Sequence, residues 1–298
     1  EAAQQADGAD GLAAPGRAVA HEGERDVAAQ RSALEGTPLL LTSVDRTPEV
    51  ATFRSDFRDY TLAFESNAGT GQSLGLEVRY SSDLDAALEG LVRLGLTTGR
   101  GTAEECARRK VKDMAWFADF SGNRIELVVR PLNSGWRYFP SRDAGIKGLS
   151  DVILRSTDID KDLSIWTGVL GAEVSDWAGD AAYLRFDGAH HRVALFPASR
   201  AGILAVEYAV EDVNLLMRNH YVLRDLQVPV VHGPGRRPAS GQLFLTFAGP
   251  ADVLFSFVAE GEVDAQGRRA RQFPAGPEGL CDWGSECKIG EFIGKAGT

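Results

Sequence analysis

Apolar residues occupy almost every position of two short segments near the C-terminus, Gln242–Phe247 and Val253–Val258. The turn-forming residues Gly249–Asp252 separate them. Two apolar runs of strand length joined by such residues predict a β-hairpin. Because successive side chains of a strand point to opposite faces, we expect both faces of this hairpin to be covered.

The chain contains a second copy of this pattern about 130 residues earlier. Phe117–Val129 has the layout of Phe247–Ala259, so that Glu126 corresponds to Ser256. Two further pairs of segments repeat in the same order, namely Arg54–Phe64 with Arg185–Phe196, and Leu74–Leu96 with Leu204–Val230. The period is longer than the roughly 20 to 50 residues of solenoid repeats. It therefore predicts two homologous domains.

Between these strands, apolar residues recur at helical spacing. The predicted helices are Glu24–Leu34, Asp83–Leu94, Asp160–Leu170 and Asp212–Leu226. For the second of them we expect Ser81 or Ser82 as the N-cap. Its inner face should carry Leu84, Leu88, Leu91 and Val92. Strands and helices alternate as βαβββ modules, twice in the second domain and less clearly in the first, which predicts an α+β fold with curved mixed sheets.

The pattern also suggests where the domains begin and end. Residues 1–15 have almost nothing to bury and are expected to form a disordered lead-in. An N-terminal domain at 16–131, a linker at 132–147, a C-terminal domain at 148–262 and a tail at 263–298 follow. Two domains agree with a length of 298 residues at roughly 100 to 200 residues per domain.

The net charge and the cysteine content argue against several classes of partner and binding site. A net charge of −10 argues against a nucleic-acid or anionic-membrane partner. Three cysteines without a CxxC motif predict neither a disulfide framework nor a zinc site. We find no run of about 18 apolar residues and no signal-peptide pattern. These features predict a cytoplasmic protein.

Three stretches of the second domain carry a resemblance to a known family. They are GLSDVILRSTDIDKDLSIWTGVLGAEV from Gly148, YLRFDGAHHRVALF from Tyr183, and GPGRRPASGQLFLTFAGPADVLFSFVAEGE from Gly233. The chain resembles, from about Val50 to Trp283, the two-domain type I extradiol catechol dioxygenases of the vicinal oxygen chelate (glyoxalase/bleomycin-resistance) superfamily. This resemblance implies paired βαβββ modules in two domains and a small aromatic substrate.

The resemblance also implies a site for Fe(II), occasionally Mn(II), built from two histidines and one glutamate of the second domain. The corresponding positions here are Asp151, Ala205 and Ser256. Alanine has no donor atom and serine offers a neutral hydroxyl, so the substitutions predict that the metal site is lost and that no cofactor is bound. Two further active-site positions differ, with Arg237 in place of a histidine and Thr246 in place of a tyrosine.

One candidate catalytic group remains, His191, which corresponds to the family's acid–base histidine. We expect the neighbouring His190 to point away from it, to solvent. Strand alternation puts Glu207 on the face of Ala205, so that Asp151, Glu207 and His191 could converge. Alternatively, Asp151 pairs with Arg155 or Arg237.

Several functions follow from these residues. The first hypothesis is a protein without the iron site that binds a small aromatic or polyketide-like molecule, as a non-catalytic binder or as a subunit paired with an active homologue. The second is a metal-independent enzyme that uses His191 for an isomerase, cyclase or lyase step. The third is a ring-cleavage dioxygenase with substitute ligands, the only one that would use Fe(II). The predicted pocket residues are Asp151, Glu207, Arg237, Thr246, Tyr183 and Ser256, and the resemblance also implies a homo-oligomer.

Overall fold

The computed structural model describes residues 12–21, 41–47, 49–65, 71–139, 145–263, 267–284, 287 and 289–293. The helix predicted at Glu24–Leu34 and the first 11 residues of the predicted lead-in lie outside these ranges. Strand β1 is Leu12–His21, so it begins inside the stretch 1–15 that was expected to be disordered. The early start follows from backbone pairing, because Leu12 is already in register with Val78 of a neighbouring strand.

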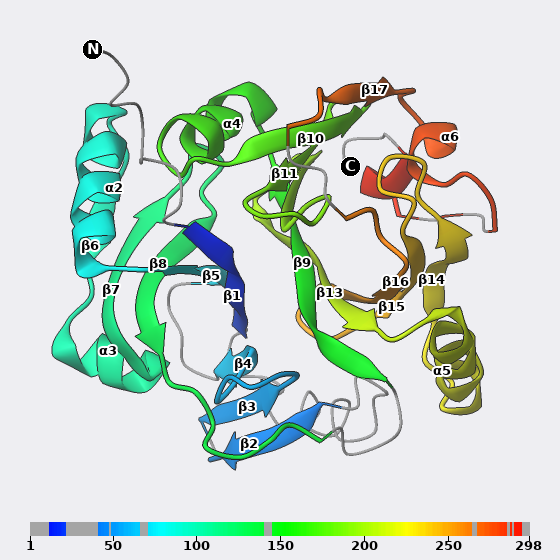
Figure 1. Cartoon of the computed structure of the whole chain (residues 1–298), viewed down its shortest axis with the longest axis horizontal. Coiled ribbons are helices and arrows are strands. Elements are labelled where there is room, and N and C mark those ends of the chain that lie inside the picture. Colours follow the sequence, from blue (N-terminus) through cyan, green and yellow to red (C-terminus); the bar gives the residue numbers. More distant parts are fainter. Residues whose placement is uncertain are drawn as a thin grey trace, which may run out of the picture.

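The described strands form two curved, mixed sheets that lie side by side (Figure 1). The first sheet contains β1, β2 (Thr42–Arg46), β3 (Val50–Arg54), β4 (Leu62–Glu65), β5 (Ser73–Val78), β6 (Thr98–Arg100), β7 (Val111–Ala118) and β8 (Arg124–Pro131). The second contains β9 (Ile146–Ser156), β10 (Glu173–Ala178), β11 (Ala181–Arg185), β12 (Val193–Pro197), β13 (Gly202–Val210), β14 (Val230–Arg236), β15 (Leu243–Ala248), β16 (Leu254–Ala259) and β17 (Arg271–Phe273).

Both sheets have the same strand order. The first is β6-β7-β8-β5-β1-β4-β3-β2. The second is β14-β15-β16-β13-β9-β12-β11-β10, with β17 added at its edge. Each strand of the first sheet thus has a counterpart in the second, which confirms the α+β fold of repeated modules.

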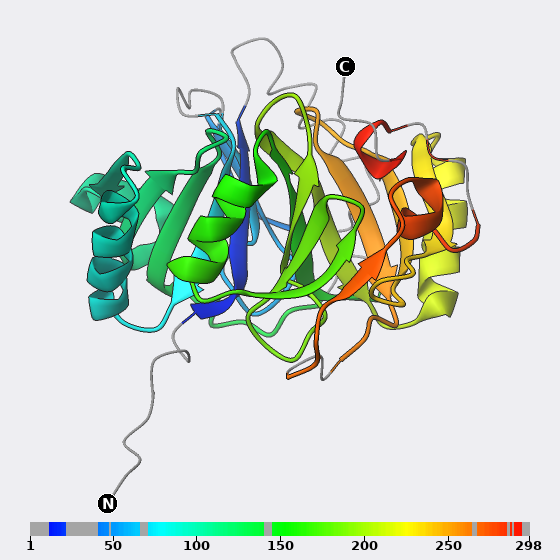
Figure 2. The same ribbon diagram turned by 90° about the horizontal axis from the view of Figure 1, so that it is seen from above.

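Helices α2, α4 and α5 cover the outer sides of the sheets, with α2 and α5 at opposite ends of the molecule (Figure 2), whereas α6 and η1 pack against the inner face of the second sheet. Their bounds are α2 Ser81–Arg93, α3 Ala103–Arg109, α4 Ile159–Gly168, α5 Val213–Asp225, α6 Pro277–Leu280 and the 3-10 helix η1 Glu291–Ile293. Asp158 and Asp212 cap α4 and α5 by accepting hydrogen bonds from Lys161 N and Leu215 N. No helix of the described residues is long and apolar enough to cross a bilayer.

Helix α2 begins two residues before Asp83, and its N-cap is Tyr80 rather than Ser81 or Ser82. The Asp83 carboxylate accepts a hydrogen bond from the Tyr80 backbone N–H at 2.8 Å, which leaves both serines inside the helix. Leu84 and Leu91 are buried as predicted, but Val92 is exposed. Val92 follows Leu91 directly, and one residue turns a helix by about 100°, so the two side chains cannot both face the sheet.

The C-terminal hairpin β15–β16 is present and buried on both faces, as predicted. Each strand starts one residue later than expected. In the connecting turn, Ala251 and Asp252 adopt left-handed φ angles of 59° and 56°.

Side chains of the first domain hold the ends of β9 and β13. Asn123 donates to Arg155 O at 2.9 Å and accepts from Gly202 N at 2.7 Å. Gln72 accepts from Ile203 N at 2.6 Å. The two strands that carry the site below are therefore anchored from across the domain boundary.

Candidate metal site in the C-terminal sheet

Four neighbouring strands place one polar residue each in a single row. Backbone register pairs Asp151 of β9 with Glu207 of β13, and Glu207 with Ser256 of β16. Ser256 is in turn paired with Thr246 of β15. Because directly paired residues point to the same face of a sheet, these four side chains line up across it.

The register shows which residue of β13 lies beside Asp151. Ala205, at the position expected for the second ligand, pairs with Ile153 and lies in an apolar cluster with Phe196 and Phe292. The residue beside Asp151 is Glu207. The position next to Asp151 is thus filled by a carboxylate and not by a methyl group.

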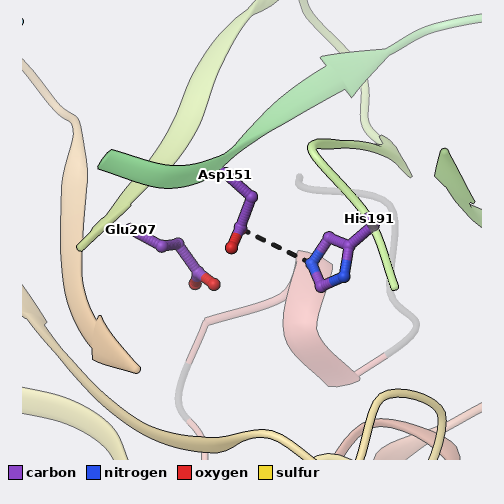
Figure 3. Close-up of side chains that lie close together, drawn as sticks. All are labelled: Asp151, His191 and Glu207. Carbon is purple, nitrogen blue, oxygen red and sulfur yellow. Dashed lines mark ion pairs between the residues drawn. The ribbon is translucent and has the colours of Figure 1, made fainter. Parts of the chain in front are cut away.

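Asp151, Glu207 and His191 point toward one another (Figure 3). One ligand atom of each lies within 4.8 Å of the others, and all three side chains are buried. His191 Nε2 is 3.5 Å from Asp151 Oδ1. The group comes from β9, β13 and the segment just before β12, three places that are far apart in the sequence.

Several polar atoms of this group have no hydrogen-bond partner. Among the described residues, both carboxylate oxygens of Asp151 and Nε2 of His191 are buried without a hydrogen-bond partner, although His191 Nε2 and Asp151 Oδ1 form an ion pair at 3.5 Å. Burying such atoms without partners is costly, and each deserves a specific reason. Two carboxylates and one imidazole are ligands that suit Fe(II) or Mn(II), and a bound cation would satisfy all of these atoms. The residues therefore fit a divalent metal ion.

Arg237 is the cation bound to Glu207. Its Nη1 and Nη2 donate to Glu207 Oε2 and Oε1, each at 2.6 Å, and all the groups are buried. Burial raises the pKa of Glu207, Arg237 opposes that rise, and Asp151 adds to it. A carboxylate has about four lone-pair sites, so a bidentate bond to Arg237 leaves Glu207 able to bind a further cation. Arg237 supplies one positive charge against the two carboxylates of Asp151 and Glu207. With both carboxylates ionised, one further positive charge is needed to neutralise the group.

In the corresponding row of the N-terminal sheet, arginine side chains balance the charge of the carboxylate. Glu126 pairs in register with Gly75 and Trp116, so it occupies the place that Ser256 holds in the second sheet. It accepts hydrogen bonds from Arg109 Nε at 2.9 Å and Arg124 Nε at 3.1 Å. Although burial acts to raise it, these arginines hold the pKa of Glu126 below its usual value.

Two curated relatives are similar to about half of the chain. An iron-dependent extradiol dioxygenase of Rhodococcus jostii is 29% identical over 164 residues, which cover 46% of this chain and 53% of the relative. A 3-methylcatechol 2,3-dioxygenase of Pseudomonas putida is 30% identical over 160 residues, 48% of this chain and 55% of the relative. The chain spans about half the length of these relatives. No family model matches it.

The similarity to solved structures covers almost the whole chain. The crystal structure of a halotolerant catechol dioxygenase matches with a TM-score of 0.82, covering 95% of this chain and 97% of that chain at 17% sequence identity. The chain has the fold of the two-domain extradiol dioxygenases. The vicinal oxygen chelate fold inferred from the sequence is thereby confirmed.

The expectation that the metal site is lost is wrong. In this extradiol dioxygenase fold, Asp151, His191 and Glu207 converge in a buried group that can hold a metal ion. The sequence comparison tested three aligned positions, two of which, Ala205 and Ser256, lack a strong ligand. The alternative that Asp151, Glu207 and His191 converge is the arrangement found, because the register and the loop before β12 bring Glu207 and His191 to Asp151.

The other predicted pocket residues lie around this group. The rings of Tyr183 and His191 are 4.9 Å apart, and burial raises the pKa of Tyr183 to about 12. The Thr246 and Ser256 hydroxyls form a 2.9 Å hydrogen bond. Arg155 does not pair with Asp151, since it donates to Ile203 O and Glu291.

A cavity of about 450 Å³ opens beside His191. Its wall includes Lys147, Arg192, Glu211, Gln242 and Glu262.

Sequence reasoning missed two residues behind the site. His190, expected to face solvent, is buried, and its Nδ1 lies 3.0 Å from His191 Nδ1. Its Nε2 lies 2.8 Å from Asp176 Oδ2. Both histidines precede β12 in irregular backbone, so strand alternation does not apply to them.

The buried histidines predict acid sensitivity. Burial lowers the pKa values of His190, His191 and His232 to about 4, 3 and 4. Below about pH 6.5 these histidines are protonated in the unfolded chain but stay neutral in the folded protein. The unfolded state therefore binds more protons, and the free energy of unfolding should fall as pH drops from 6.5 toward 4. Each histidine contributes at most about 1.4 kcal/mol per pH unit.

Urea unfolding of the metal-free protein at several pH values measures this slope. His232 is not one of the three ligand residues: it pairs in register with Thr246 and lies between the rings of Phe244 and Phe292. In His232→Gln the pH dependence should weaken. An unchanged slope in that variant would mean that His232 takes up its proton equally in the folded and unfolded states.

Proposed function

We propose that the protein is a metal-dependent extradiol-type dioxygenase that cleaves a small catechol-like aromatic molecule, with Asp151, Glu207 and His191 holding Fe(II) or Mn(II). The observation that carries the proposal is the buried, convergent triad with unpaired Asp151 oxygens and His191 Nε2. Similarity to an iron-dependent extradiol dioxygenase and a 3-methylcatechol 2,3-dioxygenase supports the reaction class.

When bound, the metal ion supplies the Lewis acidity and the redox chemistry that ring cleavage with O2 requires. With a dication present, the two carboxylates and Arg237 leave the group with one net positive charge. That charge favours a substrate bound as a monoanion, such as a catechol that has lost one proton. Arg237 also fixes the Glu207 carboxylate through two hydrogen bonds, so the ligand is oriented before any ion arrives.

The remaining polar groups suit the positioning of a substrate. Tyr183 keeps its proton at neutral pH, because burial raises its pKa to about 12, and it packs against His191. Thr246 and Ser256 extend the row beyond Glu207 with two hydroxyls that can donate to a substrate oxygen. The buried position of the triad excludes bulk water, and the 450 Å³ cavity touches the triad only at His191.

We further propose that the protein works in the cytoplasm. All three cysteines are free, including Cys281 and Cys287 in the same tail, which suits a reducing compartment. A homo-oligomeric assembly remains a prediction from the sequence resemblance.

The test is metal loading followed by turnover. Protein purified without chelator and loaded anaerobically with Fe(II) should bind about one ion per chain by elemental analysis. It should then consume O2 and turn catechol or 3-methylcatechol into a yellow product. His191→Ala should lower metal affinity by at least about 100-fold, since changes to mere outer-shell partners already cost 10- to 100-fold.

His220→Ala is the matched control, because His220 lies on α5, outside the triad. It should bind metal and turn over catechol like the unmodified protein. Protein that takes up neither Fe(II) nor Mn(II), or that binds an ion with equal affinity after His191→Ala, would refute the proposal.

A further inference from the structure

Behind His191, a buried chain of side chains leads away from the metal-binding group. His191 Nδ1 lies 3.0 Å from His190 Nδ1, and His190 Nε2 lies 2.8 Å from Asp176 Oδ2. All three side chains are buried. Two ring nitrogens in contact must include one donor and one acceptor, so the proton positions along this chain depend on one another.

Asp176 fixes one end of the chain. Arg268 donates to its two oxygens at 2.8 Å each, and Arg271 donates through its backbone N–H at 2.7 Å and its Nη2 at 2.6 Å. A carboxylate held by two guanidinium groups is ionised and can only accept hydrogen bonds. His190 Nε2 must therefore carry the hydrogen.

The proton positions then follow in order. A neutral His190 with a hydrogen on Nε2 has a lone pair on Nδ1, so His191 must donate from its own Nδ1. A neutral His191 with its hydrogen on Nδ1 has a free lone pair on Nε2. That is the atom 3.5 Å from Asp151 Oδ1 and without a hydrogen-bond partner.

We propose that Asp176, acting through His190, fixes the tautomer of His191 so that its Nε2 lone pair is available to a metal ion. Asp176 and His190 are thus positioning residues for the metal site, and this role rests on the proposed function. Second-shell hydrogen bonds of this kind orient histidine ligands in many metal sites.

Asp176, His190 and Glu262 themselves have the spacing of metal ligands. Their carboxylates are already held by guanidinium groups, since Glu262 accepts from Arg271 Nη2 at 2.9 Å and from Arg268 Nε at 3.2 Å. Arg268 and Arg271 supply the positive charge that a metal ion would otherwise have to supply. We therefore assign Asp176 and His190 to positioning, and none of the three residues to metal binding.

The test is Asp176→Asn, with Mn²⁺ affinity measured by calorimetric titration. The amide keeps only one acceptor oxygen and adds a donor nitrogen, so it no longer forces the hydrogen of His190 onto Nε2 and no longer fixes the hydrogen of His191 on Nδ1. Mn²⁺ affinity should fall by about 10- to 100-fold. Turnover at saturating Mn²⁺ should fall less, because excess metal ion favours the binding tautomer.

Glu262→Gln is the matched control, because it removes a charge from the same two arginines without touching either histidine ring. Its Mn²⁺ affinity should stay within about threefold of the unmodified protein, under 1 kcal/mol. Equal losses in both variants, or no loss in Asp176→Asn, would overturn the proposal.

Nitrogen-15 NMR of the histidine rings in the metal-free, unmodified protein tests the tautomer directly. The spectrum should show the His191 hydrogen on Nδ1, and a hydrogen on Nε2 would overturn the inference even if Asp176→Asn fails to fold. The two proposals can fail separately. Unmodified protein that binds neither Mn²⁺ nor Fe(II) but has the Nδ1–H tautomer refutes the proposed function and leaves the role of Asp176 in setting the tautomer intact.

Discussion

Asp151→Asn should make the metal-free protein more stable and remove its stabilisation by metal ions. In the metal-free protein, the Asp151 carboxylate is buried, has no hydrogen-bond partner and lies beside Glu207. An amide at this position removes the repulsion between two buried carboxylates. We expect a gain of about 1 to 3 kcal/mol in the free energy of unfolding, the size of the penalty for an unpaired buried polar group.

Metal ions should reverse the order of stability. A ligand that binds only the folded state at 100 times its Kd stabilises it by about 2.7 kcal/mol. Unmodified protein should gain this stability in Mn²⁺, and Asp151→Asn should gain almost none. Urea unfolding with and without Mn²⁺ measures both effects. Asp187→Asn, which removes a partly exposed carboxylate paired with Arg192, is the control and should change stability by 1 kcal/mol or less.

If Asp151→Asn instead destabilises the metal-free protein, then the carboxylate is already neutralised within the fold. The site would then need no cation, and the metal proposal would lose its physical basis.

Arg237→Met should have the opposite effect and a larger one. Arg237 forms both hydrogen bonds to the buried Glu207 carboxylate, and its removal leaves that charge without its cation. Removing one partner of a buried ion pair typically costs 3 to 5 kcal/mol. Urea unfolding of the metal-free protein measures the loss, and Mn²⁺ should restore part of it by supplying a replacement cation.

Two further variants distinguish the loss of the buried ion pair from the loss of the packing contacts of Arg237. Arg236→Met removes the neighbouring arginine, whose pair with Glu260 is partly exposed, and should cost 1 kcal/mol or less. The double variant Arg237→Met with Glu207→Gln removes the buried charge together with its partner, and should recover most of the loss. No recovery would attribute the loss to the packing of Arg237 over Phe244.

Local patterns were sufficient to predict most of the fold. The apolar runs and turn residues of β15 and β16 predicted that hairpin to within one residue. The internal repeat predicted the two sheets, whose strand orders are the same. The helices predicted at Asp160–Leu170 and Asp212–Leu226 were found at Ile159–Gly168 and Val213–Asp225. The first domain was less regular in the sequence, and the start of β1 was missed because it depends on pairing with distant strands.

The candidate site depends on properties that a residue pattern does not contain. Alternation along β13 indicated that Glu207 could converge with Asp151 and His191. The actual pairing depends on irregularities in the β9–β13 register, which shifts between Ile203 and Ala205 and again after Glu207. A shift of one residue exchanges the two faces of a strand. The backbone register therefore decides whether the convergence that alternation allowed takes place.

The paired arginines around Glu126 predict how many ions the protein holds. The same module occurs twice, but the first copy carries its counter-charges in its own side chains, Arg109 and Arg124. The second copy, with Arg237 alone, must take the missing charge from solution. Duplication of the fold thus need not duplicate the binding site, and saturation should occur at one metal ion per chain instead of two.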